Sequence, residues 1–277
     1  MAKGTGLIGN FKGKVGNTVG YKLSASNNGQ TQGIRVYQPI VKNPKTAAQA
    51  EQRAKLLAVN ATYRALKMVI DRGNEGLPYG NKSRLAWLKG ALMAQTMPWY
   101  KKGANPSLPV ICPVTKGSLA GIQYSIGDDS VHLVCMGVTS ATSVATIGAV
   151  STALLAGNTQ LKEGDQITFV FGVVAEGAIA FDVQSIILNK TSAEATDMFS
   201  ATDDELIIQP SNFNGVFTVI VSREGANGEH LRSTSSLSIA ATYVAQAPYD
   251  ATSKAAAIAS YQASAATNSD WAEESIQ

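Results

Sequence analysis

The sequence QITFVFGVVAEGAIAFDVQSIILN, residues 166–189, contains two runs of β-branched and aromatic residues separated by a turn that contains glycine. Runs of this composition predict β-strands, here over residues 166–174 and 179–189. Comparable runs on both sides are separated by turn-forming clusters such as GDDS and PSNFNG. These further predicted strands cover residues 118–126, 130–138, 206–210, 216–224 and 231–240. So many short strands within about 130 residues predict an antiparallel, immunoglobulin-like β-sandwich.

A glycine-rich arm occupies residues 1–42, in which polar residues alternate with β-branched and aromatic ones. The alternation predicts a β-ribbon with strands over 14–23 and 33–41. Asn28-Gly29 predicts the hairpin turn between them, because both residues tolerate positive φ. A two-stranded ribbon is marginal alone, and ordering its backbone costs about 1–2 kcal/mol per residue. We therefore expect the arm to become ordered when it pairs with a strand of a neighbouring molecule.

A helical hairpin is predicted after the arm. Asn43 and Pro44 suit the N-cap and the first turn of a helix that extends to about Asp71. A second helix is predicted from Ser83 and ends before Pro98. The apolar stripes consist of Gln52, Leu56, Val59, Tyr63, Leu66 and Ile70 in the first helix and Leu85, Leu88 and Leu92 in the second.

At 277 residues the chain is long enough for two domains. The sequence predicts an α+β protein in three parts: a basic arm with a helical hairpin at 1–102, the β-sandwich at 107–246, and a C-terminal helix with an acidic tail at 247–277. The uncharged stretch from Ser130 to Leu161 is interrupted by Ser, Thr, Gly and Asn. It therefore predicts a buried strand followed by a loop or short helix, and no membrane span.

The two halves of the chain carry opposite charge. Residues 1–102 contain 17 of the 23 Lys and Arg residues and three acidic ones, which gives +14. Residues 103–277 contain six basic and 17 acidic residues, which gives −11. Such asymmetry indicates a nucleic-acid or membrane partner for the basic half, or contact between copies of the chain.

Basic residues interleaved with Phe11, Tyr21 and Tyr37 could follow a phosphate backbone while the rings stack on bases. The competing interpretation is that this face docks on the acidic half of the same chain or of a neighbouring copy. The sequence leaves both open, because no recognised nucleic-acid-binding module accompanies the basic residues. The candidate contact residues are Lys12, Lys14, Lys22, Arg35, Lys42, Lys45, Arg53, Arg64, Lys67 and Arg72.

No enzymatic signature is present in the sequence. GNFKGKV at residues 9–15 has neither the spacing nor the Lys-Ser or Lys-Thr pair of a phosphate-binding loop. His132 and His230 lie in no nucleophile elbow and no His-x-x-x-His motif. We therefore expect a protein that is not an enzyme and holds no cofactor.

No metal-binding or disulfide framework is indicated either. Asp203-Asp204-Glu205 lacks the spaced oxygen ligands of a calcium loop and is interpreted as a solvated turn. Cys112 and Cys135 have no CxxC spacing, so we interpret them as two small buried apolar residues.

The text GNFKGKVGNTVGYKL…GIRVYQPIVKNPKTAAQAEQR within residues 9–53 resembles an uncharacterised domain family of Bacteroidota genomes, their prophages and small phages. The matching pattern is a Gly-Lys-Val-Gly-Asn hairpin, an Arg-containing strand, and Asn-Pro-Lys-Thr followed by Gln49 and Gln-Arg at 52–53. Similarity extends to about residue 100. The later half resembles the family only in the general character of its sequence, including the LRSTSSL strand. The resemblance implies a phage-linked or surface-assembly role and assigns no catalytic residue.

From these observations we expect a structural protein of a virion or comparable assembly that acts through multivalent protein contacts. Its partners would be further copies of the chain or other virion proteins, bound through the arm. The N-terminus lacks the apolar segment of a signal peptide, so the expected location is the virion, or the host cytoplasm before assembly. The alternatives are a nucleic-acid-binding or packaging protein without sequence specificity, with DNA as the partner, and a cell-surface adhesion module.

Overall fold

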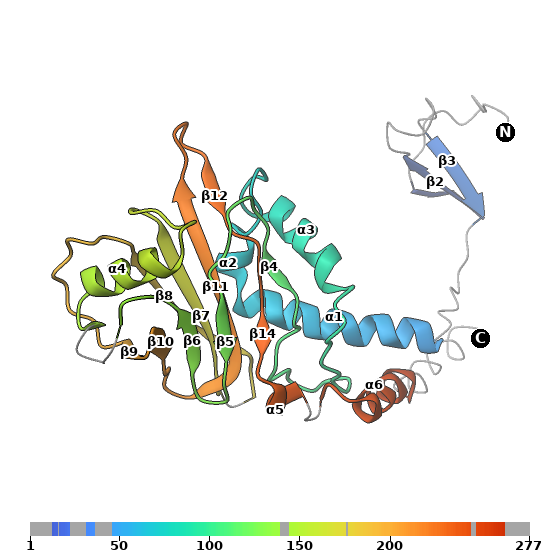
Figure 1. Cartoon of the computed structure of the whole chain (residues 1–277). Helices are drawn as coiled ribbons and strands as arrows, with labels where there is room; N and C mark the ends of the chain where they lie inside the picture. The colour runs from blue at the N-terminus through green and yellow to red at the C-terminus, as the bar shows by residue number, and fades with distance from the viewer. Residues whose placement is uncertain are drawn as a thin grey trace. The chain divides into compact units, whose positions relative to one another are not determined.

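The structure is a computed structural model that describes residues 13–15, 17–22, 32–36, 46–138, 144–175, 177–244 and 248–263 (Figure 1). The chain divides into two compact units. One consists of Met1–Lys45 with Ala266–Gln277, and the other of Thr46–Ala265. The division therefore falls at the end of the arm, whereas the sequence places it near residue 103.

Three antiparallel strands make up the described part of the first unit, in the order β1-β2-β3. They are β1 (Gly13–Val15), β2 (Thr18–Lys22) and β3 (Gln32–Val36). Val15 pairs with Thr18, so the single strand predicted over 14–23 folds back on itself as a hairpin. The sequence between them is Gly-Asn, which suits a two-residue connection. The predicted turn at Asn28-Gly29 lies outside the described residues.

The predicted helical hairpin is present as α1 (Ala47–Ala65), α2 (Lys67–Ile70) and α3 (Asn81–Ala91). The predicted capping by Asn43 is wrong: the N-cap is Thr46, whose hydroxyl oxygen accepts from the Gln49 amide at 3.3 Å. The predicted long helix is also interrupted at Leu66, where the backbone leaves the helical region.

Small residues form most of the buried side of α1. Ala54 and Ala58 are fully buried, whereas Leu56, predicted to lie in the apolar stripe, is 40% exposed. In α3 the buried residues are Ser83, Trp87 and Ala91, and the predicted Leu85 is 55% exposed. Val59, Leu66 and Ile70 of the predicted stripe are buried as expected. The small residues allow neighbouring segments to approach α1 closely, among them α6 (Ala251–Ala263), which packs against it. This last helix is the one predicted after Pro248.

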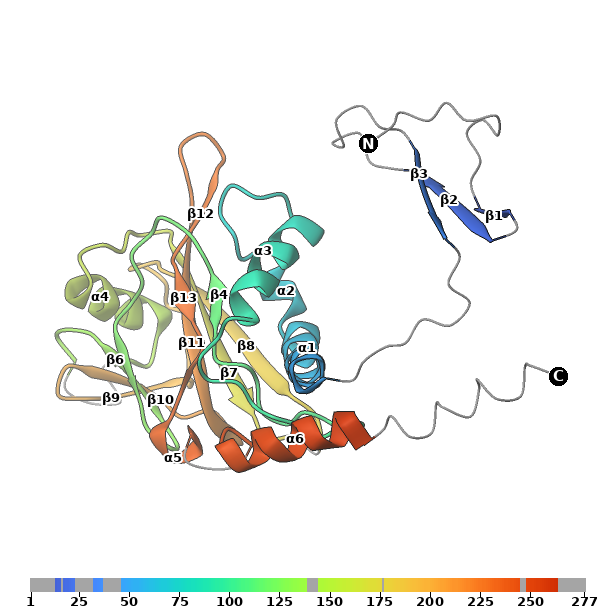
Figure 2. The same cartoon turned by 90° about the vertical axis from the view of Figure 1, so that its right-hand side faces the viewer.

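The central sheet of the second unit is antiparallel, in the order β12-β11-β7-β8, with β14 also paired to β11. Its strands are β7 (Gln166–Val173), β8 (Ala180–Ile187), β11 (Phe213–Glu224), β12 (His230–Arg232) and β14 (Ser238–Ile239). The long middle strands β7 and β11 are buried along most of their length, because other elements cover both faces of the sheet (Figures 1 and 2).

A second antiparallel sheet has the order β5-β6-β10-β9. Its strands are β5 (Tyr124–Ile126), β6 (Val131–Val134), β9 (Phe199–Thr202) and β10 (Glu205–Ile208). A shorter pair joins β4 (Pro113–Thr115) to β13 (Ser235–Ser236). Helix α4 (Ile147–Gly157) lies in the uncharged stretch, where a loop or short helix was expected, and α5 (Ala241–Val244) follows β14.

Two hydrophobic cores lie on opposite faces of the central sheet. Phe169 and Phe171 of β7 point into a core shared with β6, β9, β10 and α4. Val170, between them, points into a core shared with α1, α2 and α3. Successive side chains of β7 point to opposite faces of the sheet, so the strand contributes residues to both cores.

This arrangement confirms an α+β protein with antiparallel sheets, and the immunoglobulin-like sandwich is not confirmed. The helices expected in a separate N-terminal part cover one face of the central sheet. Residues 46–102 of the first predicted part and residues 107–246 therefore belong to one compact unit, Thr46–Ala265.

Candidate interaction surfaces

The basic residues of the arm that the structure describes lie one on each strand. Lys14 is in β1, Lys22 in β2 and Arg35 in β3. Val19 pairs with both Lys14 and Arg35, so these two cations occupy one row across the sheet. Lys12, Lys42 and Lys45 lie outside the described residues.

Further candidate cations lie on α1 and α2. Arg53 and Arg64 are separated by three helical turns and therefore lie on one side of α1, with Lys67 following at the start of α2. Arg64 and Lys67 are exposed, and Arg53 is half-buried. These residues belong to the second unit, so the structure describes no single surface that joins them to the arm cations.

Arginine and tyrosine side chains pair near the turn between α2 and α3. The guanidinium of Arg72 lies 5.3 Å from the centre of the Tyr79 ring. The guanidinium of Arg84 lies 4.6 Å from the Tyr63 ring, whose hydroxyl donates to the buried Asp71 at 2.8 Å. Such cation–π contacts hold each guanidinium in place while leaving its edge available to an anion.

Three chain segments meet beside this turn. Asn74 forms a bridge with Lys116, and Leu119 forms one with Ser233. Gly117 fits because it lacks a side chain: a Cβ there would overlap the carbonyl group of Arg232. The end of α2, the end of β4 and the end of β12 are therefore held together (Figures 1 and 2).

Glu75 ties these segments to one another. Its carboxylate accepts from the Ser118 amide and hydroxyl, both at 2.8 Å, and from the Arg232 amide at 3.1 Å. The hydrogen bonds from the backbone of Ser118 and then of Arg232 lower the pKa of Glu75 below its ordinary value of 4.5. Sequence reasoning missed this role, although Glu75 is one of only three acidic residues in the basic half.

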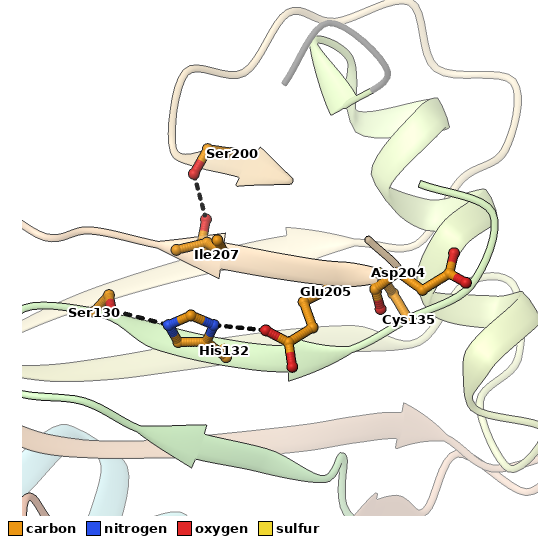
Figure 3. A network of polar contacts seen from close by, with 7 residues as sticks. All are labelled: Ser130, His132, Cys135, Ser200, Asp204, Glu205 and Ile207. Atoms are coloured by element: carbon orange, nitrogen blue, oxygen red, sulfur yellow. Dashed lines mark hydrogen bonds and ion pairs between the residues drawn. The ribbon is translucent and has the colours of Figure 1, made fainter. Parts of the chain in front are cut away.

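A chain of hydrogen bonds joins Ser130, His132 and Glu205 on the outer face of the second sheet (Figure 3). The Ser130 hydroxyl is 3.0 Å from Nε2 of His132, and Nδ1 of His132 is 2.8 Å from the Glu205 carboxylate. The order of groups is that of a hydrolytic triad. The His132 side chain is 32% exposed and that of Glu205 is 55% exposed, whereas triads act in sites that exclude water. We therefore assign these contacts to the pairing of β6 with β10.

The acidic turn next to this network is structural. Asp203 and Asp204 both have positive φ, at 44° and 63°, and connect β9 to β10. One carboxylate oxygen of Asp204 accepts from the Gly137 amide at 2.7 Å and the Val138 amide at 3.1 Å. The predicted turn is confirmed for Asp203 and Asp204, whereas Glu205 is the first residue of β10. Within the described residues no cluster of His, Cys, Asp and Glu side chains could hold a metal ion.

Both cysteines are buried and unpaired, as expected. Burial raises the pKa of Cys112 to about 12, and burial together with Asp204 and Glu205 raises the pKa of Cys135 to about 11. Thiols with such pKa values are poor nucleophiles at neutral pH. His230 is the exposed first residue of β12.

Strand β8 forms one edge of the central sheet. Its eight residues pair with β7 on one side, and the described residues supply no strand on the other. Val183 is 47% exposed and Ile187 is 61% exposed. The strand contains no Lys and no Pro, which commonly protect an edge from pairing with another chain, and its one charged residue is Asp182.

Comparisons with models of known protein families, with curated proteins and with solved structures found no match. Among the described residues, no helix combines the length and the apolar character needed to cross a membrane. The function is therefore inferred from the geometry of the chain itself.

Proposed function

We propose that this chain is a structural protein of a phage particle or a comparable surface assembly, and that its copies join by strand addition. In this proposal the arm sheet of one copy pairs with β8 of the next. The observation that carries the proposal is the unprotected edge of β8, eight residues long and partly apolar. The molecule would accumulate in the host cytoplasm before it enters the particle.

The arm offers a suitable partner for this edge. β1 and β3 are the outer strands of a three-stranded sheet, so each presents one side without a partner among the described residues. Residues 1–45 contain seven basic residues and no acidic one, whereas β8 carries Asp182 and no basic residue. Charge complementarity would favour an arm of one copy against the body of another.

Charged substitutions on β8 test the proposal directly. We expect the double variant Val183→Lys, Ile187→Lys to lose self-association, because exposed lysines on an edge oppose further strand pairing. Both side chains are exposed, so the thermal unfolding temperature of the body should change by less than about 2 °C. Sedimentation velocity at matched concentrations measures the assembly state.

The matched control is Val174→Lys, which adds one charge at a residue that is 67% exposed and lies outside β8. This variant should assemble as the wild type does. Unchanged assembly of the β8 double variant, or equal loss of assembly in the control, would overturn strand addition at this edge.

Nucleic-acid binding is the second candidate function, favoured by Arg53, Arg64 and Lys67 on one side of the helical layer. If these residues contact phosphates, affinity for DNA should fall by about tenfold or more between 50 and 200 mM salt, because bound cations release counterions. The triple variant with glutamine at these positions should reduce the slope of log affinity against log salt. Fluorescence anisotropy with a labelled duplex measures both. No binding at 50 mM salt would exclude this candidate.

A further inference from the structure

We propose that Arg72, Lys116 and Arg232 form a binding site for a phosphate group. We call these three residues the cationic junction. They lie at the meeting point of the segments that follow α2, β4 and β12 (Figures 1 and 2). The proposal does not depend on strand addition at β8.

Backbone contacts hold together the three chain segments that carry these residues. Asn74, two residues after Arg72, bridges to Lys116, and the Leu119 amide donates to the Arg232 carbonyl at 2.8 Å. The segment after α2 packs closely against β4, because a Cβ on Gly73 would lie 2.6 Å from the Val114 carbonyl oxygen. Rigid backbone positions allow a site to keep its shape before the ligand binds.

The charges at the junction are not neutralised by neighbouring acids. Among the described residues, no carboxylate lies within ion-pair distance of any of the three cations. The Glu75 carboxylate lies at the same junction, where it accepts hydrogen bonds from Ser118 and from the Arg232 backbone amide. Asp71 is turned toward Tyr63. The three cations of the junction therefore have no ion-pair partner among the described residues.

Of the other two cations, Arg72 acts on Arg232. Its partial burial, and then the positive charge of Arg72, lower the pKa of its guanidinium. Holding like charges together in a partly desolvated environment costs free energy, and an anion placed between them would remove that cost. A phosphate suits two guanidinium groups because each can donate two parallel hydrogen bonds to its oxygens.

Tyr79 extends the site. Its side chain is 66% exposed and contacts Arg72. An aromatic ring beside a phosphate site can stack on a base, so the phosphate could be free or part of a nucleic-acid backbone. The chemistry of the anion is the same in both cases, and the experiment separates the two sources.

The test compares the full-length wild type with the double variant Arg72→Gln, Arg232→Gln. Inorganic phosphate, titrated against sodium chloride of equal ionic strength, should raise the unfolding temperature of the wild type by about 3–5 °C at ten times its Kd. The double variant should show no such rise. Without phosphate it should unfold at the wild-type temperature or above, because the repulsion between the two arginines is removed.

Lys190→Gln is the matched control, because Lys190 is an exposed lysine in a different loop. It should keep the wild-type response to phosphate. A single-stranded oligothymidylate of about twelve nucleotides, followed by anisotropy, identifies the source: binding at least tenfold weaker in the double variant would assign the site to a phosphodiester backbone. Unchanged oligonucleotide binding with a lost phosphate response would assign it to free phosphate.

Two results would overturn the proposal. The first is a wild type that shows no thermal response to phosphate and no binding of the oligonucleotide. The second is a double variant that responds to both as the wild type does. Phosphorus NMR line broadening, measured on the same samples, reports binding even where a variant has altered stability.

Discussion

Replacing Phe217 with alanine is expected to lower the free energy of unfolding by about 3–5 kcal/mol. Phe217 is fully buried in β11 and lies between the two sheets. Its ring centre is 4.9 Å from that of Tyr124 in an edge-to-face contact and 5.2 Å from that of Phe171. The truncation removes these contacts and leaves a cavity that rigid strands on both sides cannot close.

Denaturant unfolding followed by tryptophan fluorescence measures this loss. Phe217→Leu, which keeps most of the volume, should cost much less, on the order of 1–1.5 kcal/mol. Val174→Ala serves as the control at an exposed position and should remain within about 0.5 kcal/mol of the wild type. A loss below about 1 kcal/mol for Phe217→Ala would contradict the packing of the two sheets against each other.

Deletion of residues 1–45 is expected to abolish self-association while the remaining body still folds. The deletion ends where the compact unit Thr46–Ala265 begins, and Thr46 is the N-cap of α1, so the helix keeps its capping residue. The arm supplies the outer strands that we propose to pair with β8 of another copy. Sedimentation velocity reports the assembly state, and circular dichroism with thermal unfolding reports the fold.

Two outcomes would show instead that the arm is a local structural element. One is a truncated protein that assembles as the full-length chain does. The other is a full-length protein, diluted to monomer, whose arm amides are protected from hydrogen exchange. A truncated body that fails to unfold cooperatively would show that the arm contributes to the fold, and Val183→Lys, Ile187→Lys then remains the test of assembly.

Strands β7 and β8 could be predicted to within two residues, because their β-branched and aromatic residues form continuous runs bounded by turn residues. Strand β9, Phe199–Thr202, could not, because Ser-Ala-Thr has no such signal and the strand is specified by its pairing with β10. The buried side of the helices was predicted in part. Val59, Leu66 and Ile70 are buried as expected, whereas Leu56 is exposed and the fully buried Ala54 and Ala58 were not predicted.

For the candidate sites, too, contacts that depend on tertiary pairing could not be predicted from the sequence. The basic character of the N-terminal half could be predicted from composition. The proximity of the segments that carry Arg72, Lys116 and Arg232 could not, because it depends on bridges between parts of the chain that are far apart in the sequence. The contact between His132 and Glu205 likewise depends on the pairing of β6 with β10.

The burial of β11 on both faces constrains the order of events during synthesis. Helices α1–α3 end at Ala91, and the strand against which they pack begins at Phe213. At a synthesis rate of about 5–20 residues per second, roughly 6–24 s pass between the synthesis of the helices and the start of their partner strand. During that interval their apolar sides have no sheet to cover. Apolar surface exposed during synthesis is prone to aggregation, so this part of the nascent chain is open to non-native contacts until the central sheet can close.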